Sequence, residues 1–333
     1  MIRFSILLLS FAFISCKTNT VTPTYESSTD YGKNITAEQL KKHLYIIASD
    51  SLEGRMTGSL GHEKALDYIE KHYKDLGITG GMPDGSYLQT VPSSFFKRGE
   101  DFPSSYNLLG FIKGSEFPNE VIVISAHSDH IGKRDDGQIY NGADDNGSGT
   151  VGVMEIARAF KNARDNGETP KRSILFLHVT GEEIGLYGSD YYTQNPVYPL
   201  ENTICNLNID MIGRVDPDKI NNPEYIYLIG SDKISTELHM ISEKANAKYT
   251  QLELDYTYND DNDPNRFYYR SDHYNFAKNG IPVIFYFNGV HEDYHDIGDT
   301  ADKIDYDLLA KRSQLVFYTA WEIANSEERL SVD

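Results

Sequence analysis

Between residues 121 and 324, short apolar runs alternate with longer helical segments, and this alternation most constrains the fold. The runs are rich in β-branched and aromatic residues and span 121–126, 173–179, 204–209, 225–229 and 282–287. Helical patterns lie between or after them, at 149–163, 186–193, 232–247 and 305–324. Continuous apolar runs of this length are typical of strands buried in a largely parallel sheet. The pattern therefore predicts an α/β fold, a three-layer α/β/α sandwich around a mostly parallel mixed sheet.

Two helical patterns precede these runs. Apolar residues recur at helical spacing after Thr36, at Leu40, Leu44 and Ile47, and a second amphipathic pattern extends from 62 to 76 before Gly77. Between 79 and 103, glycines, prolines and an aromatic stretch without a clear period predict an irregular connection. We see neither an internal repeat nor a second domain boundary, so we expect one domain over residues 35–333.

The amino terminus has the pattern of a bacterial lipoprotein signal. Residues 1–15 carry one positive charge, Arg3, before an apolar run that is too short for a bilayer, which needs roughly 20 residues. The residues FISC, ending at Cys16, resemble a lipobox, in which the cysteine is lipidated; an ordinary secretory signal is the alternative. Residues 16–34, rich in Thr, Ser and Asn, predict a flexible tether. We expect a protein of the bacterial cell envelope, periplasmic or outer-membrane associated, that meets the membrane only through a lipidated Cys16.

Charge and cysteine content exclude several classes of protein. The chain has 31 Lys and Arg against 50 Asp and Glu, a formal net charge of −19. An acidic field repels phosphate backbones, so no nucleic-acid partner is expected. Two cysteines, Cys16 and Cys205, are too few for a disulfide framework or a cysteine-rich zinc module. No obligate protein partner is implied.

Histidines and carboxylates follow four of the predicted strands. In open α/β sheets the ligand site lies beyond the carboxyl ends of the strands. Each residue alone has an ordinary structural explanation, but their convergence on one sheet edge predicts a metal site. The segments are AHSDH (126–130), GEE (181–183), NIDM (208–211) and DYHD (293–296), and the loop NGADDNGSG (141–149) lies between the first strand and its helix.

The residue types in these segments indicate the metal. Imidazole with carboxylate suits zinc, or manganese or cobalt, whereas calcium prefers oxygen ligands only. Two imidazoles and three carboxylates exceed the three protein ligands of a single catalytic zinc. They suit two zinc ions, roughly 3.5 to 4 Å apart, that share one carboxylate and a bridging hydroxide. The side chains of the adjacent Glu182 and Glu183 diverge, so one can bind metal while the other acts as general base.

Two short motifs in the chain are misleading. The residues HEDYH, 291–295, match the H-E-x-x-H motif of zincin proteases, which works only on a helix. Here the motif follows a predicted strand and lacks an apolar helical stripe, so a zincin site is not expected. Ser271-Asp272-His273 is not expected to be a catalytic triad, because neighbouring side chains point apart.

Taken together, AHSDH, NGADDNGSG, TGEEIGLYGS, NIDMIG and YHDIGDT resemble, in order, the motifs of the co-catalytic zinc peptidases typified by bacterial leucyl aminopeptidases. This family is related to glutamate carboxypeptidase, glutaminyl cyclases and the transferrin receptor. The resemblance extends from about Ser49 to about Asp305 and implies the zinc exopeptidase fold. It implies one zinc on His127 and Asp210, another on Glu183 and His295, and a bridge through Asp145.

The resemblance also implies roles for residues around the metals. Glu182 matches the general base, and Asp129 matches the carboxylate that orients the imidazole of His127. Tyr268 aligns with a tyrosine proposed to stabilise the oxyanion, although the neighbouring Tyr269 is an alternative. Asp145, rather than Asp144, directly precedes the family's Asn-Gly-Ser-Gly run, and its peptide bond to residue 146 is expected to be cis.

The implied function is an aminopeptidase that hydrolyses the N-terminal residue of peptides. A carboxypeptidase of the same family is the closest alternative and would need a basic group for the terminal carboxylate, with Arg214, Arg266 and Arg270 as candidates. A non-catalytic, receptor-like protein is an alternative of another class, because the fold can lose its metals. The glutaminyl cyclase branch generally works with one zinc and fits less well. The acidic segment 255–265 could bind calcium, although a solvated loop explains it.

Overall fold

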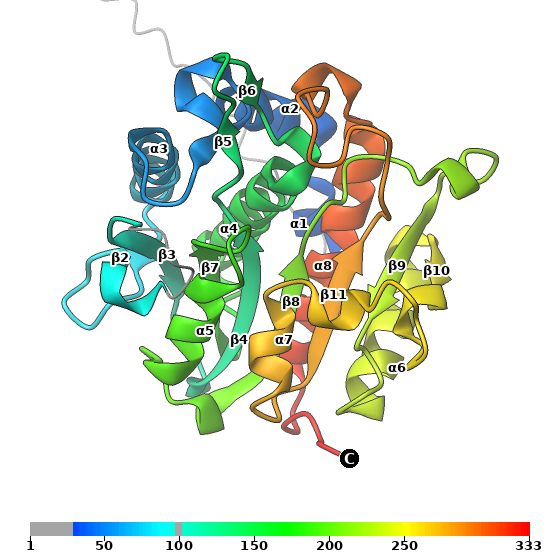
Figure 1. Ribbon diagram of the computed structural model, residues 1–333. Helices are drawn as coiled ribbons and strands as arrows, with labels where there is room; N and C mark the ends of the chain where they lie inside the picture. The colour runs from blue at the N-terminus through cyan, green and yellow to red at the C-terminus, as the bar shows by residue number, and fades with distance from the viewer. Residues whose placement is uncertain (1–28, 97–101) are drawn as a thin grey trace, which may run out of the picture.

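The computed structural model describes residues 29–96 and 102–333, so the signal peptide and Cys16 lie outside the described residues. A nine-stranded sheet forms the centre, in the order β1-β3-β7-β4-β8-β11-β9-β10, and β2 also pairs with β3 (Figure 1). Its strands are β1 (Thr79–Gly80), β2 (Leu88–Val91), β3 (Ser105–Ile112), β4 (Phe117–His127), β7 (Arg172–Val179), β8 (Thr203–Ile209), β9 (Tyr225–Ile229), β10 (Glu253–Asp255) and β11 (Val283–Phe287).

The middle of the sheet is parallel and its flanks are mixed. Strands β7, β4, β8 and β11 run parallel to their neighbours in that order. At the two sides, β3 is antiparallel to β7 and β9 is antiparallel to β11. The carboxyl ends of β7, β4, β8 and β11 therefore meet at one edge of the sheet. A separate hairpin of β5 (Gly132–Lys133) and β6 (Ile139–Tyr140) follows β4.

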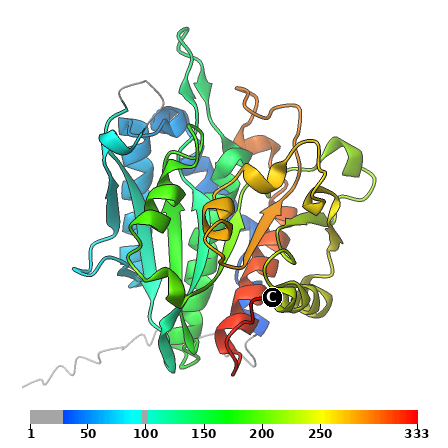
Figure 2. The ribbon, with the colours of Figure 1, turned by 60° about the horizontal axis from the view of Figure 1, so that its bottom comes forward.

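Helices cover both faces of the sheet, which gives the predicted three layers. Helices α4 and α8 pack together with α1, α2 and α3 on one face, with α6 against α8, while α5 and α7 pack on the other face (Figures 1 and 2). The helices are α1 (Thr29–Lys33), α2 (Ala37–Ile47), α3 (Leu60–Leu76), α4 (Gly149–Asp165), α5 (Tyr187–Gln194), α6 (Thr236–Ala245), α7 (His273–Ala277) and α8 (Tyr306–Asn325). Within residues 29–96 and 102–333, no helix has the length and apolarity needed to cross a bilayer.

Local sequence signals set several helix ends. The side chains of Thr36 and Ser59 accept hydrogen bonds from backbone N–H groups in the first turns of α2 and α3. Gly77 ends α3 in the left-handed region, with φ 70°, which glycine adopts without the clash of a Cβ atom. All residues of β7, β8, β9 and β11 are buried, because helices cover both faces.

The structure differs from the sequence-based expectations at four places. The predicted tether does not extend to residue 34, since 29–33 form α1 and Tyr31 is buried in the core. The predicted irregular connection contains β1 and β2, because short strands with turn residues between them have no readable period. The strand β3 was not predicted, and helix α6 ends at Ala245, where a wider turn follows to residue 250.

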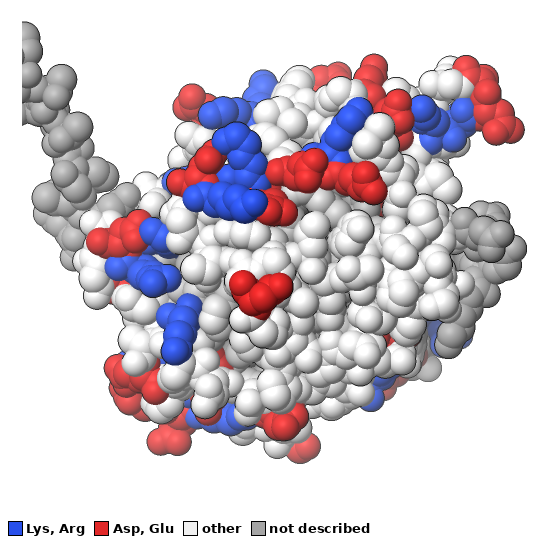
Figure 3. All heavy atoms as spheres, turned by 90° about the vertical axis from the view of Figure 1, so that its left-hand side faces the viewer, with Lys and Arg blue, Asp and Glu red and all other residues white. Residues whose placement is uncertain are grey.

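Charges of both signs mix on the face that includes α3. Figure 3 shows Lys and Arg next to Asp and Glu around a largely uncharged centre. On α3, Lys71 pairs with Asp75 at 2.5 Å and Lys74 pairs with Glu70, one helical turn apart. Such exposed pairs contribute little to stability. On this face, therefore, the acidic excess of the chain does not form a single patch.

Candidate metal centre

The carboxyl edge of the sheet brings together the predicted metal ligands. His127 is the last residue of β4, Asp210 directly follows β8, and Glu183 follows β7 after a turn through Gly181. Asp145 lies in the wide turn between the β5–β6 hairpin and α4, and His295 lies in the turns after β11. The five side chains therefore come from five separate segments, which the sheet places side by side.

The five side chains form two donor sets that share one carboxylate. The Nε2 atom of His127 lies 3.2 Å from Asp145 Oδ1 and 3.5 Å from Asp210 Oδ1. The Nε2 atom of His295 lies 3.1 Å from Asp145 Oδ2 and 3.2 Å from Glu183 Oε2. Ligands at zinc distances in a tetrahedron lie about 3.3 Å apart, so both sets fit such an ion. Asp145 offers one oxygen to each set, as expected of a bridging ligand.

Hydrogen bonds between backbone groups and the side chains of Asp299 and Asn146 hold the turn that carries the bridging carboxylate. The Asp145–Asn146 peptide bond is cis, as predicted. The carboxylate of Asp299 accepts hydrogen bonds from the N–H groups of Asp144 and Asp145. The amide of Asn146 donates to Ile209 O at 2.8 Å and accepts from the N–H of Gly149. The turn that carries Asp145 is thus fastened to β8 and to the start of α4.

A buried arginine, Arg55, holds the residues just before the same turn. Arg55, 1% exposed, donates hydrogen bonds to four backbone carbonyls, which would otherwise be buried without partners. The acceptors are the carbonyls of Ile47, Ser128, Asn141 and Gly142. Burial lowers the pKa of Arg55 to about 10, and nearby carboxylates such as Asp299 and Asp145 oppose this shift. Arg55 therefore ties the segment after α2 to the loops on both sides of the site.

The predicted role of Asp129 is only partly matched. The Nδ1 atom of His127 lies 3.1 Å from the backbone carbonyl of Asp129 and 3.8 Å from its carboxylate. The carboxylate instead accepts hydrogen bonds from Thr57 Oγ1 at 2.6 Å and from the N–H of Glu182 at 3.3 Å. Asp129 thus orients His127 through its backbone and fixes the loop of Glu182 through its side chain.

Sequence reasoning missed two residues that hold the ligands in place. His130 Nδ1 lies 2.7 Å from Glu183 Oε1, and its only sequence signal is the second histidine of AHSDH. Ser271 Oγ donates to Asp210 Oδ2 at 2.6 Å, and Asn208 donates to Ser271 Oγ. Ser271 was considered only as part of a triad. The neighbouring Asp272 accepts from Ser189, so these side chains do point apart.

The H-E-x-x-H motif is not a zincin site. Residues 292–295 form turns rather than a helix, so the two imidazoles do not share a face. His291 is buried, with Nε2 3.2 Å from Asp144 Oδ2, whereas His295 faces the donor set. The interpretation made from the sequence is confirmed.

A cavity of about 320 Å³ opens above the donor sets. Its lining combines acids and His295 with aromatic or apolar residues, which are Leu186, Met211, Phe267, Tyr269, Phe285, Phe287, Val290 and Tyr294. Of the two tyrosines considered for the oxyanion, Tyr269 lines this cavity and Tyr268 does not. Tyr268 packs instead against Gly230, with Lys233 above its ring.

Electrostatics within the site concentrate negative charge. Burial raises the pKa of Glu182 well above its usual range, and the carboxylates of Glu183 and Asp210 add to this effect. Burial acts to lower the pKa of His295, but hydrogen bonds to Asp145 and Glu183 outweigh it and raise that pKa to about 10. The site therefore has more carboxylates than cationic groups, and such an excess of negative charge favours the binding of divalent metal ions.

Fold and donor set together define the class of this protein, an α/β protein of the metallopeptidase type. The chain belongs to peptidase family M28, which it matches over residues 107–320. It is 29% identical to a probable zinc metalloprotease of Pyricularia oryzae over 79% of this chain and 58% of that protein. It is 27% identical to leupeptin-inactivating enzyme 1 of Streptomyces exfoliatus over 87% of this chain and 62% of that protein. The chain thus spans about 60% of the length of these curated relatives.

Solved structures show the same fold. LapA aminopeptidase of Legionella pneumophila is 23% identical and gives a TM-score of 0.68 over 90% of this chain and 75% of that protein. BSAP, a zinc aminopeptidase from Bacillus subtilis, is 17% identical and gives a TM-score of 0.67 over 90% of this chain and 98% of that protein. The predicted α/β/α architecture is therefore confirmed.

Proposed function

We propose that this protein is an aminopeptidase that hydrolyses the N-terminal residue of peptides and uses two zinc ions per chain. The observation that supports this proposal is the pair of donor sets that share Asp145 at the base of the cavity. His127 and Asp210 would hold one ion, and Glu183 and His295 the other. Bound zinc supplies Lewis-acid chemistry and lowers the pKa of water.

Glu182 is the general base in this proposal. It is half-buried in the cavity wall, and its carboxylate lies within 4.8 Å of the donor atoms of His127 and Glu183. A raised pKa favours a group that takes a proton from the attacking water and returns it to the leaving amine. The hydrogen bond from its backbone N–H to Asp129 holds it at this position.

The cavity wall favours substrates with a free amine and an apolar first side chain. Glu182 is the one carboxylate of the cavity lining that holds no zinc in this proposal, and its charge attracts the cationic α-amine, because Coulomb attraction is strong in a partly desolvated site. The aromatic wall, including Phe267, Phe285 and Phe287, provides apolar surface for the side chain. We therefore propose leucine-like or aromatic residues as preferred N-terminal residues.

The alternative, a carboxypeptidase, depends on Arg270. Of the three arginines considered, only Arg270 lines the cavity, with its guanidinium over the ring of Phe267. Arg214 pairs with Asp293 at 3.0 Å, and Arg266 lies over the ring of Tyr269. One exposed cation at the rim is a weaker clamp than the bidentate pairs that fix carboxylates firmly.

A substrate comparison with Glu182→Gln tests the proposal. We expect the zinc-loaded protein to hydrolyse leucyl p-nitroanilide and leucyl peptides, and Glu182→Gln to lose about 10²- to 10⁴-fold in kcat with unchanged zinc content. Equal hydrolysis by both proteins would overturn the mechanism. A preference for N-acetylated peptides would overturn the aminopeptidase assignment, and no hydrolysis at all would favour the receptor-like alternative.

We also propose that Cys16 anchors the protein in a bacterial envelope membrane through a lipid. The FISC segment and the Ser- and Thr-rich residues that follow it support this proposal. In a cell fractionation experiment, the wild type should partition with membranes and into detergent, and Cys16→Ser should not. Retention of Cys16→Ser in the detergent phase would refute the anchor.

A further inference from the structure

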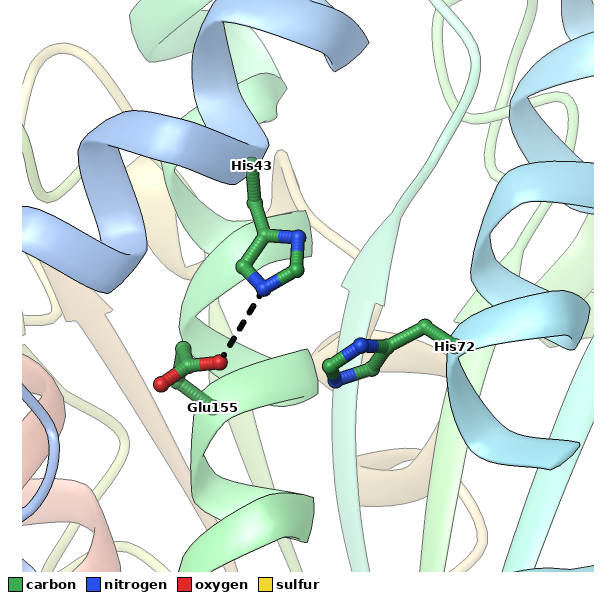
Figure 4. Close-up of side chains that lie close together, drawn as sticks. All are labelled: His43, His72 and Glu155. Carbon is green, nitrogen blue, oxygen red and sulfur yellow. Dashed lines mark ion pairs between the residues drawn. The ribbon is translucent and has the colours of Figure 1, made fainter. Parts of the chain in front are cut away.

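A second cluster of metal-ligating side chains lies between three helices of the other layer. His43 comes from α2, His72 from α3 and Glu155 from α4, and the three side chains point toward one another (Figure 4). One donor atom of each lies within 4.8 Å of the other two. The cluster shares no residue with the donor sets at the sheet edge, and the proposed aminopeptidase mechanism does not use it.

Two polar atoms in this cluster are buried without a hydrogen-bond partner. They are Nε2 of His72 and Oε1 of Glu155. Glu155 is fully buried, and its other oxygen accepts hydrogen bonds from Arg158. His43 Nε2 lies 3.3 Å from the free oxygen, without hydrogen-bond geometry. Buried polar groups are nearly always satisfied, so two atoms without hydrogen bonds that face one space point to a place where a ligand can bind.

The two imidazoles are suited to bind a cation. Tyr68 Oη lies 2.7 Å from His43 Nδ1, and a proton on Nδ1 that is donated to this oxygen leaves the Nε2 lone pair facing Glu155. The Nε2 atom of His72 has no hydrogen-bond partner among the described residues, so no hydrogen bond at this atom has to break before a metal binds.

We propose that His43, His72 and Glu155 bind a third divalent metal ion, zinc, in a site separate from the catalytic centre. Two imidazoles and one carboxylate form a known zinc ligand set, whereas calcium would not select imidazole. The 3.3 Å between His43 Nε2 and Glu155 Oε1 fits adjacent corners of a zinc tetrahedron, about 3.3 Å apart. His72 is partly exposed, which leaves a path for the ion and a water as fourth ligand.

The proposed ion would join three helices that are otherwise held by side-chain packing. Helix α4 begins just after the turn of Asp145, and α2 leads into the segment of Arg55. An ion at this place would fasten α2 and α3 to α4, a structural role rather than a catalytic one. Because it binds only the folded chain, zinc at this site would also stabilise the fold.

Zinc stoichiometry tests the proposal independently of the catalytic centre. The full mature chain, dialysed against zinc and measured by mass spectrometry of the metal, should lose one zinc per chain on His72→Ala. A variant with His127→Ala and His295→Ala should retain a zinc that disappears when His72→Ala is added. His239→Ala, a partly exposed histidine on α6, is the matched control and should lose none. An unchanged zinc count on His72→Ala would overturn the proposal, whatever the catalytic centre binds.

Two further measurements keep the proposal testable if the triple variant does not fold. Crystals of the wild type should show an anomalous peak at the zinc edge bonded to His43, His72 and Glu155. Zinc added to the variant with His127→Ala and His295→Ala should raise its melting temperature by a few degrees, and a further His72→Ala should abolish that rise. A zinc-soaked crystal without this peak would overturn the proposal and leave the contact of His43 with Glu155 as a structural one.

Discussion

The molecule holds two clusters of histidine and carboxylate, and they differ in what surrounds them. At the sheet edge, five donors from five loops and strand ends face an open cavity. Between α2, α3 and α4, three donors on helices face one another, and none of them lines that cavity. Chemistry on a peptide also needs room for the substrate beside the metal, and the cavity provides this room at the first cluster.

The two clusters also differ in charge balance. At the sheet edge carboxylates are in excess. Burial acts to lower the pKa of His127, but the charges of Asp210 and Glu182 outweigh burial and raise this pKa well above its usual range. In the helical cluster Arg158 already neutralises Glu155, and burial lowers the pKa of His72 to about 4. Similar residue types therefore attract cations at one site and present neutral ligands at the other.

The largest expected difference between the clusters is in catalysis. We expect Asp145→Asn to lower kcat/KM for leucyl p-nitroanilide by about 10³-fold or more, because both donor sets lose a shared carboxylate. His72→Gln should remain within about twofold of the wild type. Parallel assays and zinc analysis of the two variants check this. Full activity in Asp145→Asn, or a 10³-fold loss in His72→Gln, would reverse the roles assigned to the clusters.

A buried histidine outside both clusters gives the next largest effect, on stability in acid. His178 bonds to Tyr73 at 2.8 Å, and burial, with a contribution from His72, lowers its pKa to about 3. Between pH 6.5 and 3 the unfolded chain binds one more proton at this residue than the folded chain, so acidification destabilises the fold. The loss is about 1.4 kcal/mol per pH unit.

Urea unfolding of the metal-free protein at several pH values measures this effect. His178→Gln can still hydrogen-bond to Tyr73. In the acid range its free energy of unfolding should depend less steeply on pH than that of the wild type, by about one proton taken up on unfolding. His239→Gln, which alters a partly exposed ring, should follow the wild type. Identical slopes in wild type and His178→Gln would mean that this histidine does not stay neutral in the folded protein.

The smallest effect is expected at the rim of the cavity. Arg270 is exposed, and exposed charge pairs contribute roughly 0 to 1 kcal/mol. Arg270→Met should therefore change KM for leucyl p-nitroanilide by less than about fivefold. A loss of about 100-fold that appears only with substrates bearing a free carboxylate would instead favour the carboxypeptidase alternative.

The sequence predicted the ligands of the cluster at the sheet edge, because the ends of strands can be recognised in the sequence. His127, Glu183 and Asp210 each follow an apolar run by zero to three residues, and parallel strands bring their carboxyl ends together. The same reasoning could not choose between Tyr268 and Tyr269, since the direction of a side chain in a tight turn depends on backbone angles such as the positive φ of Arg266.

The helical cluster could not be predicted from the sequence. His43, His72 and Glu155 lie on three helices separated by long connections, and a helical period shows which face is apolar but not which neighbour it meets. Their pairing depends on how α2 and α3 rotate against α4. The contacts of Ser271 and His130 with the ligands depend in the same way on packing between distant segments.

The four hydrogen bonds of Arg55 also decide how much of this chain forms one cooperative unit. The family match begins at residue 107, yet the carbonyls of Ser128, Asn141 and Gly142, which border the turn of Asp145, depend on a donor from residue 55. A fragment trimmed to 107–320 would lack this donor, together with α2 and α3. The turn that carries Asp145 therefore depends on a residue that precedes the segment matched by the family model.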